Sequence, residues 1–193
     1  MRVRLFTVLA FAALTCGASA ATLSLHLEVV MLEGSGWTRE RAAGVLREAA
    51  AILARCGVAL EGADPVVLAV PPRLMDFSTP AARELALAHP VGRPAVYLVR
   101  GTRSHPAFDA EAIGRGNSRT RPEIADTVWM TAATRDPGIA LAHELAHVLM
   151  DSGEHSAEAG NLMRGETSAR NTSLSAAQCA RLRDTGSAHG LLK

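Results

Sequence analysis

The spacing of apolar residues along this chain changes from the period of a strand to that of a helix and back, which restricts its fold more than any other feature. From Thr22 to Met31, apolar residues recur at every second position, as in a half-buried strand. Thr38 can cap a following helix with a single apolar stripe, and Gly57 can end that helix. The pattern therefore predicts a mixed α and β domain.

Further strands and helices are predicted after Gly57. The strand candidates are Val66 to Val70, Ala95 to Arg100 and Asp126 to Thr131, and Thr79 to Ala88 is compatible with a helix. This strand, helix, strand order favours parallel pairing with right-handed crossovers. The polar stretch from Gly101 to Arg121 is expected to be a loop, with an exposed edge strand near Ala110 to Ile113. Leu174 to Leu182 is expected to form a last amphipathic helix.

Residues 1–20 have the pattern of a secretory signal peptide. Arg2 and Arg4 precede an apolar run from Leu5 to Leu14, which is too short to span a membrane, and Ala18-Ser19-Ala20 fits a cleavage site. Lipid attachment at Cys16 is a weaker alternative, because Thr15 is a poor residue before a lipidated cysteine. We expect residues 21–193 to form one domain that is secreted or periplasmic.

Charge and cysteine content limit the partners and the compartment. Without Arg2 and Arg4 the chain has 18 basic and 19 acidic residues, so nothing attracts it to nucleic acid or to an anionic membrane. We expect neither as a partner, and we expect a monomer. Cys56 and Cys179 remain after the leader is removed. In an oxidising compartment they are expected to form a disulfide between the first long helix and the last helix.

The residues that indicate chemistry follow the strand that ends at Thr131. Asp136 before Pro137 predicts a helix start, with the aspartate as cap, and the helix should run to about Asp151. His143 and His147 are four residues apart and so project from one face of that helix, with Glu144 at its border. Two imidazoles in this arrangement can bind one zinc ion, and a catalytic zinc needs a third protein ligand.

His155 is the expected third ligand, and Glu154 and Glu158 are the competing choices. Gly153 can adopt a left-handed conformation there, which would let the chain leave the helix and turn back toward the metal. The remaining histidines are interpreted as solvated residues rather than ligands: His26, His89, His105 and His189.

The stretch HELAHVLMDSGEHS followed by GNLM resembles the metzincin clan of zinc peptidases, in which a methionine turn lies beneath the metal. The resemblance implies a metzincin-like fold: a twisted, mostly parallel sheet with an antiparallel edge strand, a long helix after the first strand, an active-site helix and a C-terminal helix. It implies Zn²⁺ bound by His143, His147 and His155, supported by Met163.

This chain departs from the clan's pattern in two ways. The clan usually has a glycine where Met150 stands and its third histidine where Gly153 stands, so the turn here is two residues longer. Some relatives also use a tyrosine after the methionine turn, whereas the only tyrosine here is Tyr97, and we do not expect it near the metal.

These residues predict an exported zinc metalloendopeptidase with Glu144 as the general base. The resemblance implies that a peptide or protein substrate lies extended along the edge strand in the region 110–120. Two alternatives use the same residues: a zinc-binding recognition protein without turnover, and a hydrolase of cell-wall amide bonds.

Overall fold

The computed structural model describes residues 21–62, 64–105, 107–116 and 118–193. The expected signal peptide, with Cys16, lies outside the described residues. Among those described, no helix is both long and apolar enough to cross a membrane.

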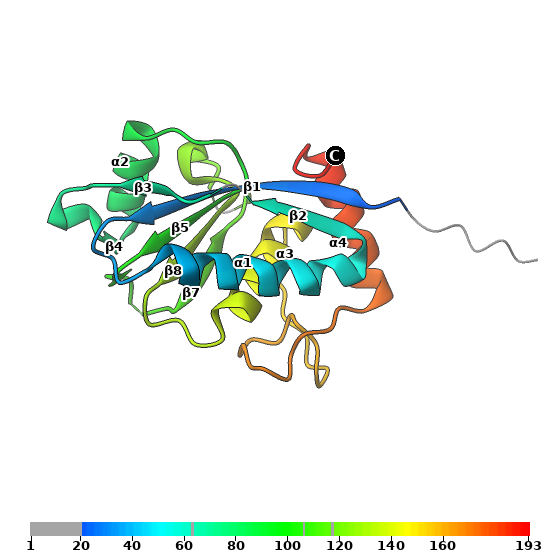
Figure 1. Ribbon diagram of the computed structural model, residues 1–193. Coiled ribbons are helices and arrows are strands. Elements are labelled where there is room, and N and C mark those ends of the chain that lie inside the picture. The colour runs from blue at the N-terminus through cyan, green and yellow to red at the C-terminus, as the bar shows by residue number, and fades with distance from the viewer. Residues whose placement is uncertain (1–20, 63, 106, 117) are drawn as a thin grey trace, which may run out of the picture.

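A twisted sheet forms the centre of the molecule (Figure 1), with strand order β2-β1-β5-β8-β7 and β3 also paired to β1. All of its pairs are parallel except β7 with β8. This confirms the mostly parallel sheet and the antiparallel edge strand. The strands are β1 (Leu23–Leu32), β2 (Val58–Gly62), β3 (Val66–Leu68), β5 (Ala95–Val99), β7 (Ala110–Ile113) and β8 (Thr127–Thr131), and β4 (Asp76–Phe77) pairs separately with β6 (Gly101–Thr102).

The helices divide between the two faces of the sheet. On one face, Val96 and Leu98 of β5 pack into a core shared with α1 (Arg39–Leu53), α3 (Pro137–Met150) and α4 (Ala176–Ala188). On the other face, Tyr97 packs with Trp129 and with α2 (Thr79–Ala88). Short 3-10 helices also occur: η1 (Ala54–Cys56), η2 (Pro72–Leu74) and η3 (Pro122–Ile124). The mixed α/β class is thus confirmed, and α3 is the helix buried against the sheet between α1 and α4.

Some element boundaries differ from those predicted. Strand β2 was not predicted, because it is only five residues long and begins directly after the turn at Gly57. Strand β3 ends at Leu68 rather than Val70, before Pro71 and Pro72, and proline cannot donate a backbone hydrogen bond to a sheet. Helix α4 begins at Ala176, after the capping residue Ser175, and continues to Ala188.

The two predicted helix starts have different outcomes. Thr38 caps α1 as expected, because its hydroxyl accepts a hydrogen bond from the backbone nitrogen of Arg41 at 3.2 Å. Asp136 was expected to cap α3 in the same way, and this is wrong. Its backbone is left-handed, with φ 45°, and its side chain makes no capping hydrogen bond. Pro137 does stand in the first turn of α3, where its missing N–H leaves no helical hydrogen bond unmade.

A disulfide joins Cys56 at the end of η1 to Cys179 on α4, with 5.0 Å between the two Cα atoms. The expected link between the first long helix unit and the last helix is therefore present. Since α4 also packs on α3, this bond holds α4 against the helix that carries the histidine pair.

Candidate metal centre

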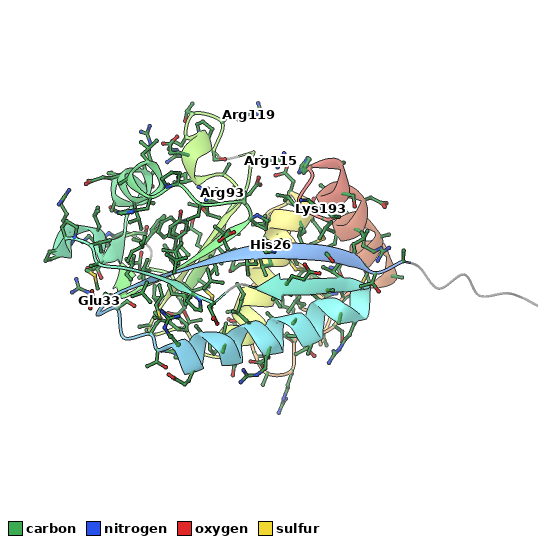
Figure 2. The ribbon with its side chains drawn as sticks, turned by 45° about the horizontal axis from the view of Figure 1, so that its top comes forward. His26, Glu33, Arg93, Arg115, Arg119 and Lys193 are labelled. Carbon is green, nitrogen blue, oxygen red and sulfur yellow. A yellow bond between two sulfur atoms is a disulfide. The ribbon has the colours of Figure 1, made fainter. Side chains whose placement is uncertain are left out.

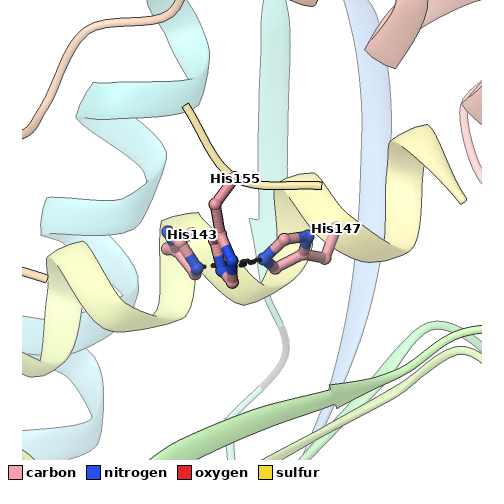
Figure 3. Close-up of side chains that lie close together, drawn as sticks. All are labelled: His143, His147 and His155. Atoms are coloured by element: carbon pink, nitrogen blue, oxygen red, sulfur yellow. Dashed lines mark hydrogen bonds between the residues drawn. The ribbon is translucent and has the colours of Figure 1, made fainter. Parts of the chain in front are cut away.

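Helix α3 places His143 and His147 one above the other at its buried surface (Figure 3). Both residues are buried, and their Nε2 atoms are 3.0 Å apart. Almost every residue of α3 is buried, because this helix packs between the sheet, α1 and α4. The two imidazoles are therefore carried by one of the most tightly packed elements of the fold.

Each of these imidazoles is fixed by a backbone carbonyl through its other nitrogen. His143 Nδ1 lies 2.7 Å from the carbonyl oxygen of Leu162, and His147 Nδ1 lies 2.6 Å from that of Ser152. A carbonyl oxygen only accepts, so both Nδ1 atoms carry the proton and both Nε2 atoms present lone pairs. This is the orientation that a histidine ligand of a metal normally receives from its surroundings.

His155 reaches the same point from the loop after α3 (Figure 3). Its Nε2 is 3.3 Å from the Nε2 of His147, and ligand atoms of all three histidines lie within 4.8 Å of one another. The competing carboxylates are engaged elsewhere. Glu154 contacts Arg181 at 3.0 Å, and Glu158 accepts a hydrogen bond from Asn161. Of the three candidates, the structure brings His155 to the histidine pair.

The turn that carries His155 does not use Gly153 as expected. The left-handed residue after α3 is Asp151, with φ 45°, whose backbone N–H donates to the carbonyls of His147 and Val148. Gly153 has no positive φ. The expectation for Gly153 is wrong because the chain reverses two residues earlier, and that early turn also supplies the Ser152 carbonyl that holds His147.

The segment Asn161-Leu162-Met163 lies beneath the histidines, bonds His143 directly and bonds the residue after His155. The carbonyl of Leu162 fixes His143, and the carbonyl of Met163 accepts a hydrogen bond at 2.7 Å from the backbone nitrogen of Ser156, next to His155. The Asn161 side chain closes this turn by accepting from the Met163 nitrogen at 2.9 Å. Met163 itself is buried in the core.

The spacing of the three histidine Nε2 atoms suits binding to a common metal ion better than direct contact with one another. Two Nε2 atoms that both present lone pairs repel at 3.0 Å unless a cation lies between them. Two nitrogens bound to one tetrahedral zinc at its usual bond length are about 3.3 Å apart, close to the observed 3.0 and 3.3 Å. The group can therefore hold a metal ion, and its all-imidazole composition suits zinc.

Burial controls the charge of the groups around the site. It lowers the pKa of His143 and lowers that of His147 to about 4, with the neighbouring histidines adding to the effect on His147. Both rings are thus neutral at pH 7, the form that binds metals. Burial also raises the pKa of Glu144 to about 8, while a hydrogen bond from the backbone of Ala112 acts in the opposite direction. The hydrogen bond from Ala112 places the Glu144 carboxyl against the edge strand β7.

A cleft of about 700 Å³ opens above the histidines. One side is strand β7, the last strand of the sheet, and one of its edges has no strand neighbour among the described residues. Four charged residues of this cleft were not identified from the sequence, because isolated charged residues carry no motif: Glu111 on β7, and Asp109, Arg135 and Glu166 in loops. Tyr97 was expected to be remote and is, since it lies on the opposite face of the sheet.

Comparisons with known proteins give a structural likeness only. Neither a family model nor a curated protein sequence matches this chain. The fold is similar to that of metalloproteinase-II from Bacteroides fragilis, with a TM-score of 0.62 and 17% sequence identity over 86% of this chain. The match covers 55% of that protein, so this chain spans about half of its length. The arrangement of strands and helices is therefore that of a metalloproteinase fold.

Proposed function

We propose that this protein is an exported, metzincin-like zinc metalloendopeptidase. The observation that carries the proposal is the convergence of three histidine Nε2 atoms beside the buried carboxyl of Glu144, at the floor of a cleft bordered by an edge strand. The likeness of the fold to a metalloproteinase supports it. The disulfide supports export, because such bonds persist in oxidising compartments.

Residues His143, His147 and His155 would hold the ion through their Nε2 atoms. A zinc ion with three neutral ligands lowers the pKa of a bound water to about 7 and polarises a carbonyl group. The positive charge of a bound ion would lower the pKa of Glu144 from its value of about 8 and favour the carboxylate. That carboxylate would accept the proton of the attacking water and return it to the nitrogen of the departing amine. The backbone of β7 would bind the peptide in an extended conformation, by adding it as a strand.

The deciding experiment compares the wild type with Glu144→Gln. We expect about one zinc per chain in both proteins by elemental analysis, because Glu144 is not a ligand. We expect hydrolysis of casein by the wild type alone, with activity reduced at least about 1000-fold in the variant. A chelator should abolish wild-type activity, and added zinc should restore it.

Each other outcome has a clear meaning. Absence of zinc from the wild type would contradict the proposed metal centre. Zinc without hydrolysis of casein or of a peptide library would favour a zinc-binding recognition protein. Hydrolysis restricted to cell-wall amides would identify a hydrolase of cell-wall amide bonds. N-terminal sequencing of the exported protein should find Ala21 first.

A further inference from the structure

Strand β7 pairs with β8 and packs on α3, and further contacts hold its two ends. It is four residues long, and within the part of the chain that the structure describes it pairs with β8 alone, from Ala110 with Met130 to Ile113 with Thr127. A short strand at the edge of a sheet frays unless its ends are held. In the proposed function this strand binds the substrate, so what holds its ends also shapes the cleft.

The start of β7 is fixed by main-chain and hydroxyl contacts. The carbonyl of Asp109 accepts from the backbone nitrogen of Thr131 at 2.8 Å and from the hydroxyl of Thr134 at 2.6 Å. Thr134 is buried, so solvent does not compete strongly for these bonds.

The end of β7 is held by the Arg115 guanidinium and by the Ser118 hydroxyl, which donates to the carbonyl of Gly114 at 2.7 Å. Arg115 Nε donates to both carboxylate oxygens of Asp126, at 3.1 and 2.9 Å, and its Nη2 donates to the carbonyl of His189 at 3.1 Å. Asp126 immediately precedes β8, and His189 follows α4. Figure 2 shows Arg115 between the β7–β8 region and the C-terminal segment. One side chain thus connects the end of the edge strand to two other elements.

Because the Asp126 carboxylate is buried, its ion pair with Arg115 cannot easily be substituted by other side chains. The Asp126 side chain is 7% exposed, whereas that of Arg115 is 40% exposed. A buried carboxylate needs a charged partner, and the planar guanidinium can serve the carboxylate and a carbonyl at once, which a lysine ammonium does with less defined geometry. The next arginine in the loop, Arg119, is exposed and forms no ion pair with any described residue.

We propose that Arg115 is a positioning residue of the cleft, holding the end of β7 in the extended form that a peptide substrate would pair with. The proposal rests on the proposed function. Arg115 does not line the cleft, so it acts through the strand and touches no reacting atom.

The test compares Arg115→Ala with the double variant Arg115→Ala, Asp126→Asn and with the control Arg119→Ala. The double variant removes the carboxylate that the single change would leave buried and unpaired. Hydrogen exchange is measured on the metal-loaded protein. We expect amides of residues 110–113 to exchange about tenfold faster in the first two proteins, since charge-assisted bonds are about twice as strong as neutral ones. The exchange rates of β5 amides should be unchanged in these variants. In Arg119→Ala, no amide should change its exchange rate.

Kinetics separate positioning from a general loss of structure. For a peptide of about eight residues, long enough to pair along β7, KM should rise about tenfold in Arg115→Ala with kcat nearly unchanged. A blocked dipeptide should show no change in either constant. Partial unfolding would instead lower the apparent kcat for both substrates equally and leave KM alone.

Equal exchange at residues 110–113 in all proteins would overturn the proposal, as would equal acceleration in β5 and β7. Equal kinetic effects on both peptides would overturn it too. If the wild type cleaves neither peptide, the proposed function fails, and the exchange rates alone then decide whether Arg115 holds the strand.

Discussion

His143 and His147 each bond a backbone carbonyl through Nδ1, which leaves the lone pair of Nε2 available to a metal ion. The carbonyls of Leu162 and Ser152 set the tautomer and the tilt of each ring. His155 differs from them, because it lies on an exposed loop and has its clearest contact with His147. Its contribution to metal binding is therefore the one that most needs measurement.

We expect His155→Ala to weaken zinc binding at least about 100-fold, because it removes a proposed ligand rather than an outer partner. Competition with a chelating dye measures this affinity. Glu154→Ala is the matched control, since Glu154 is the adjacent residue and pairs with Arg181 instead. Similar losses in both variants would argue against His155 as the third ligand.

At the scale of elements, the turn at residues 161–163 is tied to α4. Asn161 Nδ2 donates to the Oε1 of Gln178 at 2.9 Å, and Gln178 is part of the capping box of α4. The turn beneath the histidines is thus connected to the helix that the disulfide holds in place. A change at Asn161 should reach the histidines through the carbonyl of Leu162.

Asn161→Ala should lower the free energy of unfolding by about 1–3 kcal/mol, because it leaves the Met163 nitrogen without its acceptor. It should also weaken zinc binding about tenfold or more. Asn171→Ala is the control: Asn171 is buried too and donates to the carbonyl of Glu166, but it does not hold a histidine. Both should lose stability in a denaturant titration, and only Asn161→Ala should lose zinc affinity.

The small sheet of β4 and β6 gives a pH-dependent prediction. The hydrogen bond from Arg100 lowers the pKa of Asp76, against the opposing effect of burial. Because the native pKa is below the unfolded value, the pair stabilises the fold above about pH 4 and loses this effect as pH falls through the native value. Asp76→Asn should cost no more than about 1 kcal/mol at pH 7, since Arg100 is half exposed. Urea titrations should show a smaller difference in unfolding free energy between the wild type and Asp76→Asn at pH 3 than at pH 7. An equal difference at both pH values would contradict this prediction.

The order of the main elements could be predicted from the sequence, because apolar periodicity reports which faces are buried. The pair His143 and His147 was visible for a similar reason, since its spacing is a property of one helix. The bends were less predictable. Asp136 and Asp151 both adopt left-handed conformations that no residue pattern indicated. The carbonyls of Leu162 and Ser152 have no sequence signal, because every residue has a carbonyl and only the fold decides where it points.

For the whole molecule, the disulfide is the longest-range covalent constraint. It joins residues 123 positions apart, and closing so long a loop restricts the unfolded chain strongly. Replacing Cys56 and Cys179 together by serine should lower the free energy of unfolding by about 3–5 kcal/mol, measured by guanidinium titration. Equal stability of the two proteins under oxidising conditions would contradict this.

The same bond affects how the molecule tolerates backbone cleavage. Every residue of the cleft lies between Cys56 and Cys179 in the chain, as do exposed loop residues such as Arg103 and Arg119. A nick in one of those loops, including one made by another copy of the proposed peptidase, would yield two fragments that remain covalently joined. Such a molecule would run as one band on a non-reducing gel and as two after reduction, and it could keep its histidines together despite the cut.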